Sequence, residues 1–396
     1  MLTHWRAHSE RGFPRFQAWM LAPALVALAG CGSPAVGPCQ SAPGIEAICG
    51  FKNPEDMRLL PDSKTLLISQ VGALGRTSSG SLVFFDTQSQ QISAAFPPSN
   101  PLADANFMSG SLPKDSSWGA SNCPGPPGAE FSPLGISIQQ RRDGRWQVAA
   151  VNHGLRMSVE MFEWLQVGAH YRLEWRGCVP TPAEVSMNSV ALLRHGGFVA
   201  SHMFDRTAPN VLGFSTGLWK SQLGFDTGYA FEWQPGQDGE FRVLSGSPGP
   251  FLNGIELSAD EREVFVSVTS GNQIRKLDRA SGKLLATLAL ERPDNLSWDA
   301  QGYMLAASLT GSRLQNLICI QNTGESCGLA FEIVRIDPAD MSSELVFKHE
   351  GAPMGAATVA QQVGDFLYLG SFTGDRILKI PYARKKKTQS ADLKQR

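Results

Sequence analysis

Five oxygen-bearing side chains stand at the starts of successive strand-like segments. They are Glu55 in "NPEDM", Asn188 in "MNSV", Asn253 in "LNGI", and Asp294 and Asn295 in "PDNL". Two carboxylates and three amides suit a hard cation such as Ca²⁺, whereas zinc or copper would favour nitrogen and sulfur ligands. A single Asn beside a strand is more often a turn former. Because the five recur at corresponding positions, they predict one shared calcium site.

The segments that carry these side chains form an irregular repeat. Six units open near Glu55, Leu134, Asn188, Asn253, Asp294 and Ala357. Each contains strand-length apolar runs of period two separated by turn residues, and only residues 215–224 read as a short helix. This pattern predicts an all-β fold, a six-bladed β-propeller over residues 51–383 whose first strands line a central metal-binding channel. Two β-sandwich domains are the alternative.

Composition excludes several classes of protein. The chain has 396 residues, and 35 Lys and Arg against 36 Asp and Glu give a net charge of −1. No global positive field is available for nucleic acid, so we expect no nucleic-acid partner. Hydrophobic residues make up 42% of the chain, which excludes intrinsic disorder.

The ends of the chain carry targeting and polar segments. Three arginines precede the apolar run "AWMLAPALVALAG", which at 13 residues is too short to span a bilayer. The following "LAGC" resembles the bacterial lipoprotein signal box. It implies that residues 1–31 are a signal peptide, that Cys31 is lipidated, and that the protein is exported to the periplasmic side and anchored in the outer membrane. An ordinary secretory peptide with an incidental cysteine is the alternative. A tether is expected at 32–50 and a basic polar tail at 384–396.

Six cysteines remain once Cys31 is set aside. They are Cys39, Cys49, Cys123, Cys178, Cys319 and Cys327. An even number in an exported chain predicts disulfides, for which 15 pairings exist. We favour Cys319 with Cys327, which would close a small polar loop, and then Cys39 with Cys49. None has CxxC spacing, so structural zinc is not expected.

Several stretches, in order along the chain, resemble landmarks of the paraoxonase/arylesterase family. They are "NPEDMRLLPDSKTLLIS", "SPLGIS", "VNHGLRMSVEMFEW", "FLNGIELSADEREVFVS" and "RPDNLSWDAQG". More distantly they resemble gluconolactonases and strictosidine-synthase-like proteins. The resemblance implies a six-bladed propeller with a catalytic calcium on the five oxygen donors. It also implies a buried second calcium on Asp56 and the carbonyl of Ile136, although Ser189 stands where the family has an Asp.

The family's catalytic histidines are only partly matched. Its "VNH" histidine is His153, but its first histidine falls on Leu134. A further pocket histidine matches His202, while another aligns with Leu309, and Phe251 matches an aromatic wall. The resemblance therefore makes His153 and His202 the catalytic candidates, with leucines and Phe251 lining the substrate pocket. The alternatives are a histidine packed behind the channel for His153 and one on a solvated loop for His202.

These features predict a calcium-dependent hydrolase of lactones or aryl esters. Ca²⁺ would polarise the carbonyl of a small-molecule substrate for attack by water. Leucine at position 134 removes a general base, a contribution of about 10²–10⁴-fold. One alternative is a non-catalytic, calcium-stabilised propeller that binds a small ligand or a protein partner. Another is a sugar lactonase with a less specific divalent metal. The insertions near 90–130 and 205–235 are expected to act as lids.

Overall fold

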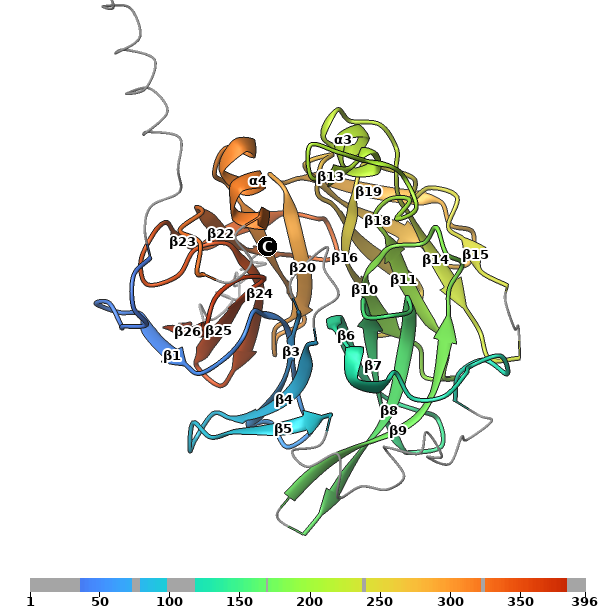
Figure 1. The fold of residues 1–396 in the computed structure, drawn as a ribbon, viewed down its shortest axis with the longest axis horizontal. Helices are drawn as coiled ribbons and strands as arrows, with labels where there is room; N and C mark the ends of the chain where they lie inside the picture. Colours follow the sequence, from blue (N-terminus) through green and yellow to red (C-terminus); the bar gives the residue numbers. More distant parts are fainter. Residues whose placement is uncertain are drawn as a thin grey trace, which may run out of the picture. The chain divides into compact units, whose positions relative to one another are not determined.

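Six four-stranded antiparallel sheets make up the fold, as the repeat predicts (Figure 1). The computed structural model describes residues 36–72, 79–97, 118–168, 170–236, 240–321 and 325–382. The expected signal peptide with Cys31 and the basic tail lie outside these ranges, so both stay predictions. Within the described residues, no helix is long and apolar enough to cross a membrane.

Each sheet is one blade, and its strands follow in order from the innermost to the outermost. Blade 1 is β2 (Pro54–Leu59), β3 (Thr65–Gln70), β4 (Ser81–Asp86) and β5 (Ile92–Phe96). Blade 2 is β6 (Pro133–Gln140), β7 (Trp146–Asn152), β8 (Ser158–Val167) and β9 (His170–Pro180). Blade 3 is β10 (Met187–Leu192), β11 (Phe198–His202), β14 (Tyr229–Trp233) and β15 (Arg242–Val243). Blade 4 is β16 (Leu252–Leu257), β17 (Glu263–Val268), β18 (Gln273–Asp278) and β19 (Leu284–Ala289). Blade 5 is β20 (Pro293–Trp298), β21 (Met304–Leu309), β22 (Phe331–Ile336) and β23 (Ser343–His349). Blade 6 is β24 (Ala357–Val363), β25 (Phe366–Ser371), β26 (Arg376–Pro381) and β1 (Glu46–Cys49).

The innermost strands follow one another around a closed ring. β2 contacts β6, and the contacts continue through β10, β16, β20 and β24 back to β2. All six begin within a residue or so of the openings predicted from the sequence. The core is divided between the blades, since buried apolar side chains of each sheet pack on those of the next. A radial arrangement of this kind lets a long chain fold as one propeller without a single large core.

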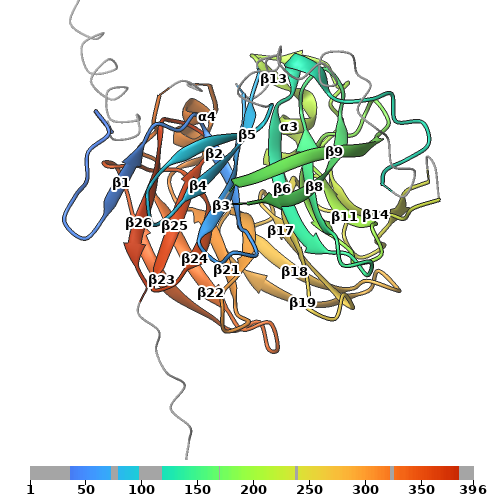
Figure 2. The ribbon, with the colours of Figure 1, turned by 90° about the horizontal axis from the view of Figure 1, so that it is seen from below.

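Strand β1 closes the ring, and this corrects the predicted tether. Residues 46–49 lie within the segment expected to be a tether, yet they pair antiparallel with β26. Both ribbon views show β1 beside β26 (Figures 1 and 2). Ile48 is buried against the interface of blades 1 and 6. The Pro- and Gly-rich composition of the segment hid a four-residue strand whose partner lies more than 300 residues away in sequence.

Each inner strand also has a β-bulge near its start. The register shifts fall after Pro54, Pro133, Met187, Leu252, Pro293 and Ala357. A bulge adds an unpaired residue and re-aims the neighbouring side chains, which is why bulges are common beside functional sites. The six bulges mark the end of the channel where the predicted metal ligands lie.

Three disulfides connect the six cysteines. Cys319–Cys327 and Cys39–Cys49 confirm the two pairings favoured from the sequence, and Cys123–Cys178 is the third. Structural disulfides form in oxidising compartments, so the three bonds are consistent with an exported protein.

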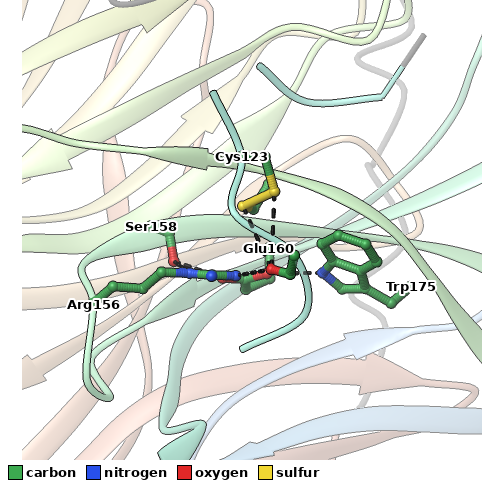
Figure 3. Close-up of a disulfide and its surroundings, with 7 residues drawn as sticks. Cys123, Arg156, Ser158, Glu160 and Trp175 are labelled. Atoms are coloured by element: carbon green, nitrogen blue, oxygen red, sulfur yellow. Dashed lines mark hydrogen bonds and ion pairs between the residues drawn. A yellow bond between two sulfur atoms is a disulfide. The ribbon is translucent and has the colours of Figure 1, made fainter. Parts of the chain in front are cut away.

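The Cys123–Cys178 bond fastens the loop before β6 to the outer strand of blade 2 (Figure 3). Beside it, the buried Glu160 accepts hydrogen bonds from Ser158 Oγ at 2.6 Å and Trp175 Nε1 at 2.8 Å. Arg156 pairs with the same carboxylate at 2.8 Å and donates to the Gly125 carbonyl of the loop at 2.5 Å. The loop is therefore held by a covalent bond and by a hydrogen bond from Arg156, whose guanidinium is itself paired with the buried Glu160.

Two short helices and a two-stranded ribbon lie between strands. Helix α3 (Thr216–Gln222) confirms the predicted helix, and Ser215 caps it by accepting from the Gly217 N–H at 3.0 Å. It follows the ribbon of β12 (Asn210–Val211) and β13 (Phe214–Ser215). Helix α4 (Arg313–Gln321) was not predicted, because its apolar residues form no clear stripe of helical period. A single 3₁₀ turn, η1, covers Gly128–Glu130.

Candidate metal centre and channel

The five predicted metal ligands are all buried at the bulged starts of inner strands. Each is 6% exposed or less, although all five are polar. They come from four blades, on β2, β10, β16 and β20. Burial of this many polar side chains requires that partners satisfy them.

The side-chain amides of the three asparagines contact neighbouring protein groups through their nitrogen atoms. Asn295 Nδ2 donates to Glu55 Oε1 at 2.9 Å, and the Asn253 side chain hydrogen-bonds to the Asp294 carboxylate. Asn188 Nδ2 lies 3.6 Å from the Met203 sulfur. The amide nitrogens are therefore directed to the protein, which leaves the amide oxygens for another partner.

Four buried oxygens of this set have no hydrogen-bond partner among the described residues. They are Glu55 Oε2, Asn188 Oδ1, Asn253 Oδ1 and Asn295 Oδ1. A buried acceptor without a partner costs about 1–3 kcal/mol. Four such oxygens at one end of the channel are explained by a cation that takes oxygen ligands. The residues present therefore fit Ca²⁺.

Electrostatics favour the same occupant. Burial raises the pKa of Asp294 to about 8, and the neighbouring Asp56 adds to the rise, while Asn253 opposes it. Burial also raises the pKa of Glu55 well above its ordinary value, with Asp56 and Asp294 as further causes. Among the described residues no three His, Cys, Asp or Glu side chains are grouped to hold a metal. A cation at this position would therefore need the amide oxygens as well as the carboxylates.

Two glycines allow the inner strands to approach at this end. A Cβ at Gly254 would lie 2.5 Å from the Asp294 carbonyl oxygen, and one at Gly135 would lie 2.6 Å from the Asn188 carbonyl oxygen. Contacts that short do not occur, so any other residue would push neighbouring blades apart. This is a physical reason for glycine after Leu134 and after Asn253.

The carboxylate implied for a second calcium, that of Asp56, is already engaged. Asp56 Oδ1 accepts from the Met57 N–H at 2.8 Å and pairs with Arg58 Nη1 at 2.7 Å. Asp56 Oδ2 accepts from the Ile136 N–H at 2.8 Å. Both oxygens of Asp56 are thus used within the protein, and the residues present do not fit a second metal.

His153 is fixed against blade 3. Its Nε2 contacts the Met187 carbonyl oxygen, and its backbone N–H donates to the Ser132 carbonyl at 2.8 Å. Desolvation lowers the pKa of His153 to about 4, so the ring is neutral near pH 7. With the proton on Nε2, Nδ1 is the atom that can accept a proton or a hydrogen bond.

His202 lies in β11 and is 4% exposed, so the alternative of a solvated loop is wrong. Its Nδ1 accepts from the Ser186 N–H at 3.0 Å, and its ring lies 4.7 Å from that of Tyr229. Desolvation lowers the pKa of His202 to about 4. The proton of the neutral ring is therefore on Nε2, which makes His202 a hydrogen-bond donor and not a base in this arrangement.

The three residues predicted to line a substrate pocket are apolar and lie near the bulged end. Leu134 on β6 is 3% exposed and Leu309 at the end of β21 is 4% exposed. Phe251 is half-buried, with its ring 5.7 Å from that of Phe204. No sequence pattern pointed to Phe204, which follows β11 and joins the wall only in the folded ring.

A cavity of about 860 Å³ opens at the other end of the inner strands. All six inner strands line it through their second halves, including Ser137, Leu192, Trp298 and Gln361. Arg58 and Glu256 lie at its inner end and form an ion pair of 3.2 Å. Neither residue was singled out from the sequence. The alternation of β2 places Arg58 on the same face as Asp56, and this signal could have found it.

The buried histidines predict how stability depends on pH. Their folded pKa of about 4 lies below the ordinary 6.5, so between these values the unfolded chain binds protons that the folded chain does not. The contribution of the two histidines to the free energy of unfolding should be largest above pH 6.5 and fall as the pH is lowered to 4. In His202→Asn the amide oxygen of the asparagine can replace Nδ1 as acceptor. Urea titrations at several pH values should show that the free energy of unfolding depends less on pH in this variant than in the wild type. His170→Gln, on an exposed hairpin, is the control, and an unchanged slope in His202→Asn would contradict the assignment.

Comparisons with known proteins give matches to solved structures alone. No family model matches the chain, and no curated protein matches its sequence. The solved structures that match include a luciferin-regenerating enzyme (12% identity, 85% of this chain and 94% of that one covered, TM-score 0.49). They also include a gluconolactonase from Xanthomonas campestris (13% identity, 89% of this chain and 96% of that one covered, TM-score 0.46). A third is regucalcin, a calcium-binding protein from Agrobacterium tumefaciens (12% identity, 85% of this chain and 95% of that one covered, TM-score 0.43). Identities this low do not extend an activity from those proteins to this chain.

Proposed function

We propose that the protein is a calcium-dependent hydrolase of lactones or aryl esters that acts at the bulged end of its channel. The observation that supports the proposal is the set of four buried oxygens without partners, on four different inner-strand residues. When bound there, Ca²⁺ would polarise the ester carbonyl and stabilise the negative charge that develops on its oxygen. Gluconolactonases and a calcium-binding regucalcin share the fold, but their low identity does not carry the activity across.

The chain's own residues orient the donors and the substrate. Asn295 and Asn253 hydrogen-bond to the two channel carboxylates and so fix their oxygens. Leu134, Leu309 and Phe251 offer apolar surface to the acyl or aryl part of a substrate. His153 Nδ1 is the acceptor we assign to a proton of the attacking water, since Nε2 is held at the Met187 carbonyl.

The direct test is hydrolysis of γ- and δ-lactones and phenyl acetate by the protein that lacks residues 1–31. Turnover should vanish after chelation and return with Ca²⁺. If nothing is turned over while Ca²⁺ still raises Tm, the metal is structural and the protein is a non-catalytic propeller.

Leu134→His tests the position of the missing base. A histidine there should raise kcat, by up to the about 10²–10⁴-fold that general bases provide. Leu134→Gln is the matched control, because it adds polarity without a titratable group near neutrality. Equal rates in both variants would show that position 134 does not face the reacting centre.

A further inference from the structure

Arg58 bridges opposite walls of the channel. It lies on β2, whereas its partner Glu256 lies on β16, and these are the first and fourth inner strands of a ring of six. Nη2 of Arg58 is 3.2 Å from Glu256 Oε1, while Nη1 is 2.7 Å from Asp56 Oδ1. The three side chains are largely buried, with exposed fractions of 8%, 14% and 0% for Arg58, Glu256 and Asp56.

The guanidinium is the cation that these carboxylates share. Asp56, Glu256 and Glu55 each interact electrostatically with Arg58 and together raise its pKa, against desolvation. A guanidinium is planar, weakly hydrated and charged at every physiological pH, so it suits a buried site between carboxylates. Asp56 also accepts from the N–H groups of Met57 and Ile136, and Arg58 occupies the remaining face of Oδ1.

We infer that Arg58 takes the place of a second cation in the channel, so that the propeller binds a single calcium, at its bulged end. The role of Arg58 follows from its own contacts, whereas the count of one calcium rests on the proposed function. Two nitrogens of one guanidinium contact carboxylates on its two sides. Removing it leaves Asp56 and Glu256 without their shared cation, and we expect a divalent ion to bind between them, since Ca²⁺ takes carboxylate oxygens as ligands at about 2.3–2.6 Å.

The experiment counts bound calcium by equilibrium dialysis in the wild type and four variants. We expect one bound ion in the wild type, two in Arg58→Met and none in Asn253→Leu. The variant that combines Arg58→Met with Asn253→Leu should bind one ion. Arg58→Met should also gain a second calcium-dependent rise in Tm. Adding Glu256→Gln to Arg58→Met is the matched control and should return the count to one, since it removes a carboxylate from the gap.

The outcomes separate this inference from the proposed function. Two ions in the wild type, or no gain in Arg58→Met, would overturn the role of Arg58. If the wild type binds none but Arg58→Met binds one, the proposed function fails and the role of Arg58 stands. If Arg58→Met does not fold even with Ca²⁺, Arg58→Lys decides. Lysine keeps the charge, so one ion supports the inference and two ions overturn it.

Discussion

Asp294→Asn is expected to lower kcat/KM for calcium-dependent lactone hydrolysis by about 10²–10³-fold or more, the loss typical of removing one group that stabilises an oxyanion. Asp294 is 5% exposed and supplies one of the two carboxylates of the proposed centre. Asparagine keeps the shape and an oxygen but removes the charge that holds the cation. Steady-state kinetics at a fixed Ca²⁺ concentration measure this loss.

The same substitution should change stability in the opposite direction. Without metal, Asp294 is a buried carboxylate near Asp56 and Glu55, so its neutral replacement should raise the Tm of the chelated protein. Ca²⁺ at 100 times its Kd stabilises the wild type by about 2.7 kcal/mol, and this gain should disappear in the variant. Asp340→Asn, at an exposed turn where the carboxylate accepts from the Ser342 N–H, is the control. A calcium-dependent Tm that survives in Asp294→Asn would contradict the metal assignment.

Replacing Cys123 and Cys178 together by Ala is expected to lower the free energy of unfolding by about 4 kcal/mol. These cysteines are 55 residues apart, and a cross-link over a longer loop removes more entropy from the unfolded chain. Urea unfolding under oxidising conditions measures the change. The Arg156 contact to Gly125 remains, so the loop should stay in place in the folded variant.

The Cys319–Cys327 bond is the internal control for this prediction. Its cysteines are 8 residues apart, and the same relation predicts about 2.5 kcal/mol for its removal. The order of the two effects is the decisive observation. A larger loss from the short loop than from the long one would show that native-state contacts, and not loop entropy, set the contribution of these disulfides.

The sequence by itself determined the blades and the candidate metal ligands. Alternating apolar strands have a period that residues reveal locally, and a polar residue at the same place in each unit marks the channel end. Glu55, Asn188, Asn253, Asp294 and Asn295 were all found in this way, and all are buried at bulged strand starts. The short Cys319–Cys327 loop was equally local, because its ends lie close together in any compact conformation.

Only the tertiary structure decided which distant residues meet. Strand period tells which face of a blade a side chain occupies, but it carries no information about the blade across the channel. Arg58 and Glu256 therefore showed no sign of being partners, and residues 46–49 showed none of pairing with β26. The tautomer of His202 likewise depends on the N–H of Ser186, the residue before the neighbouring strand β10. Closing the ring creates these contacts, and they determine where the channel's charges are neutralised.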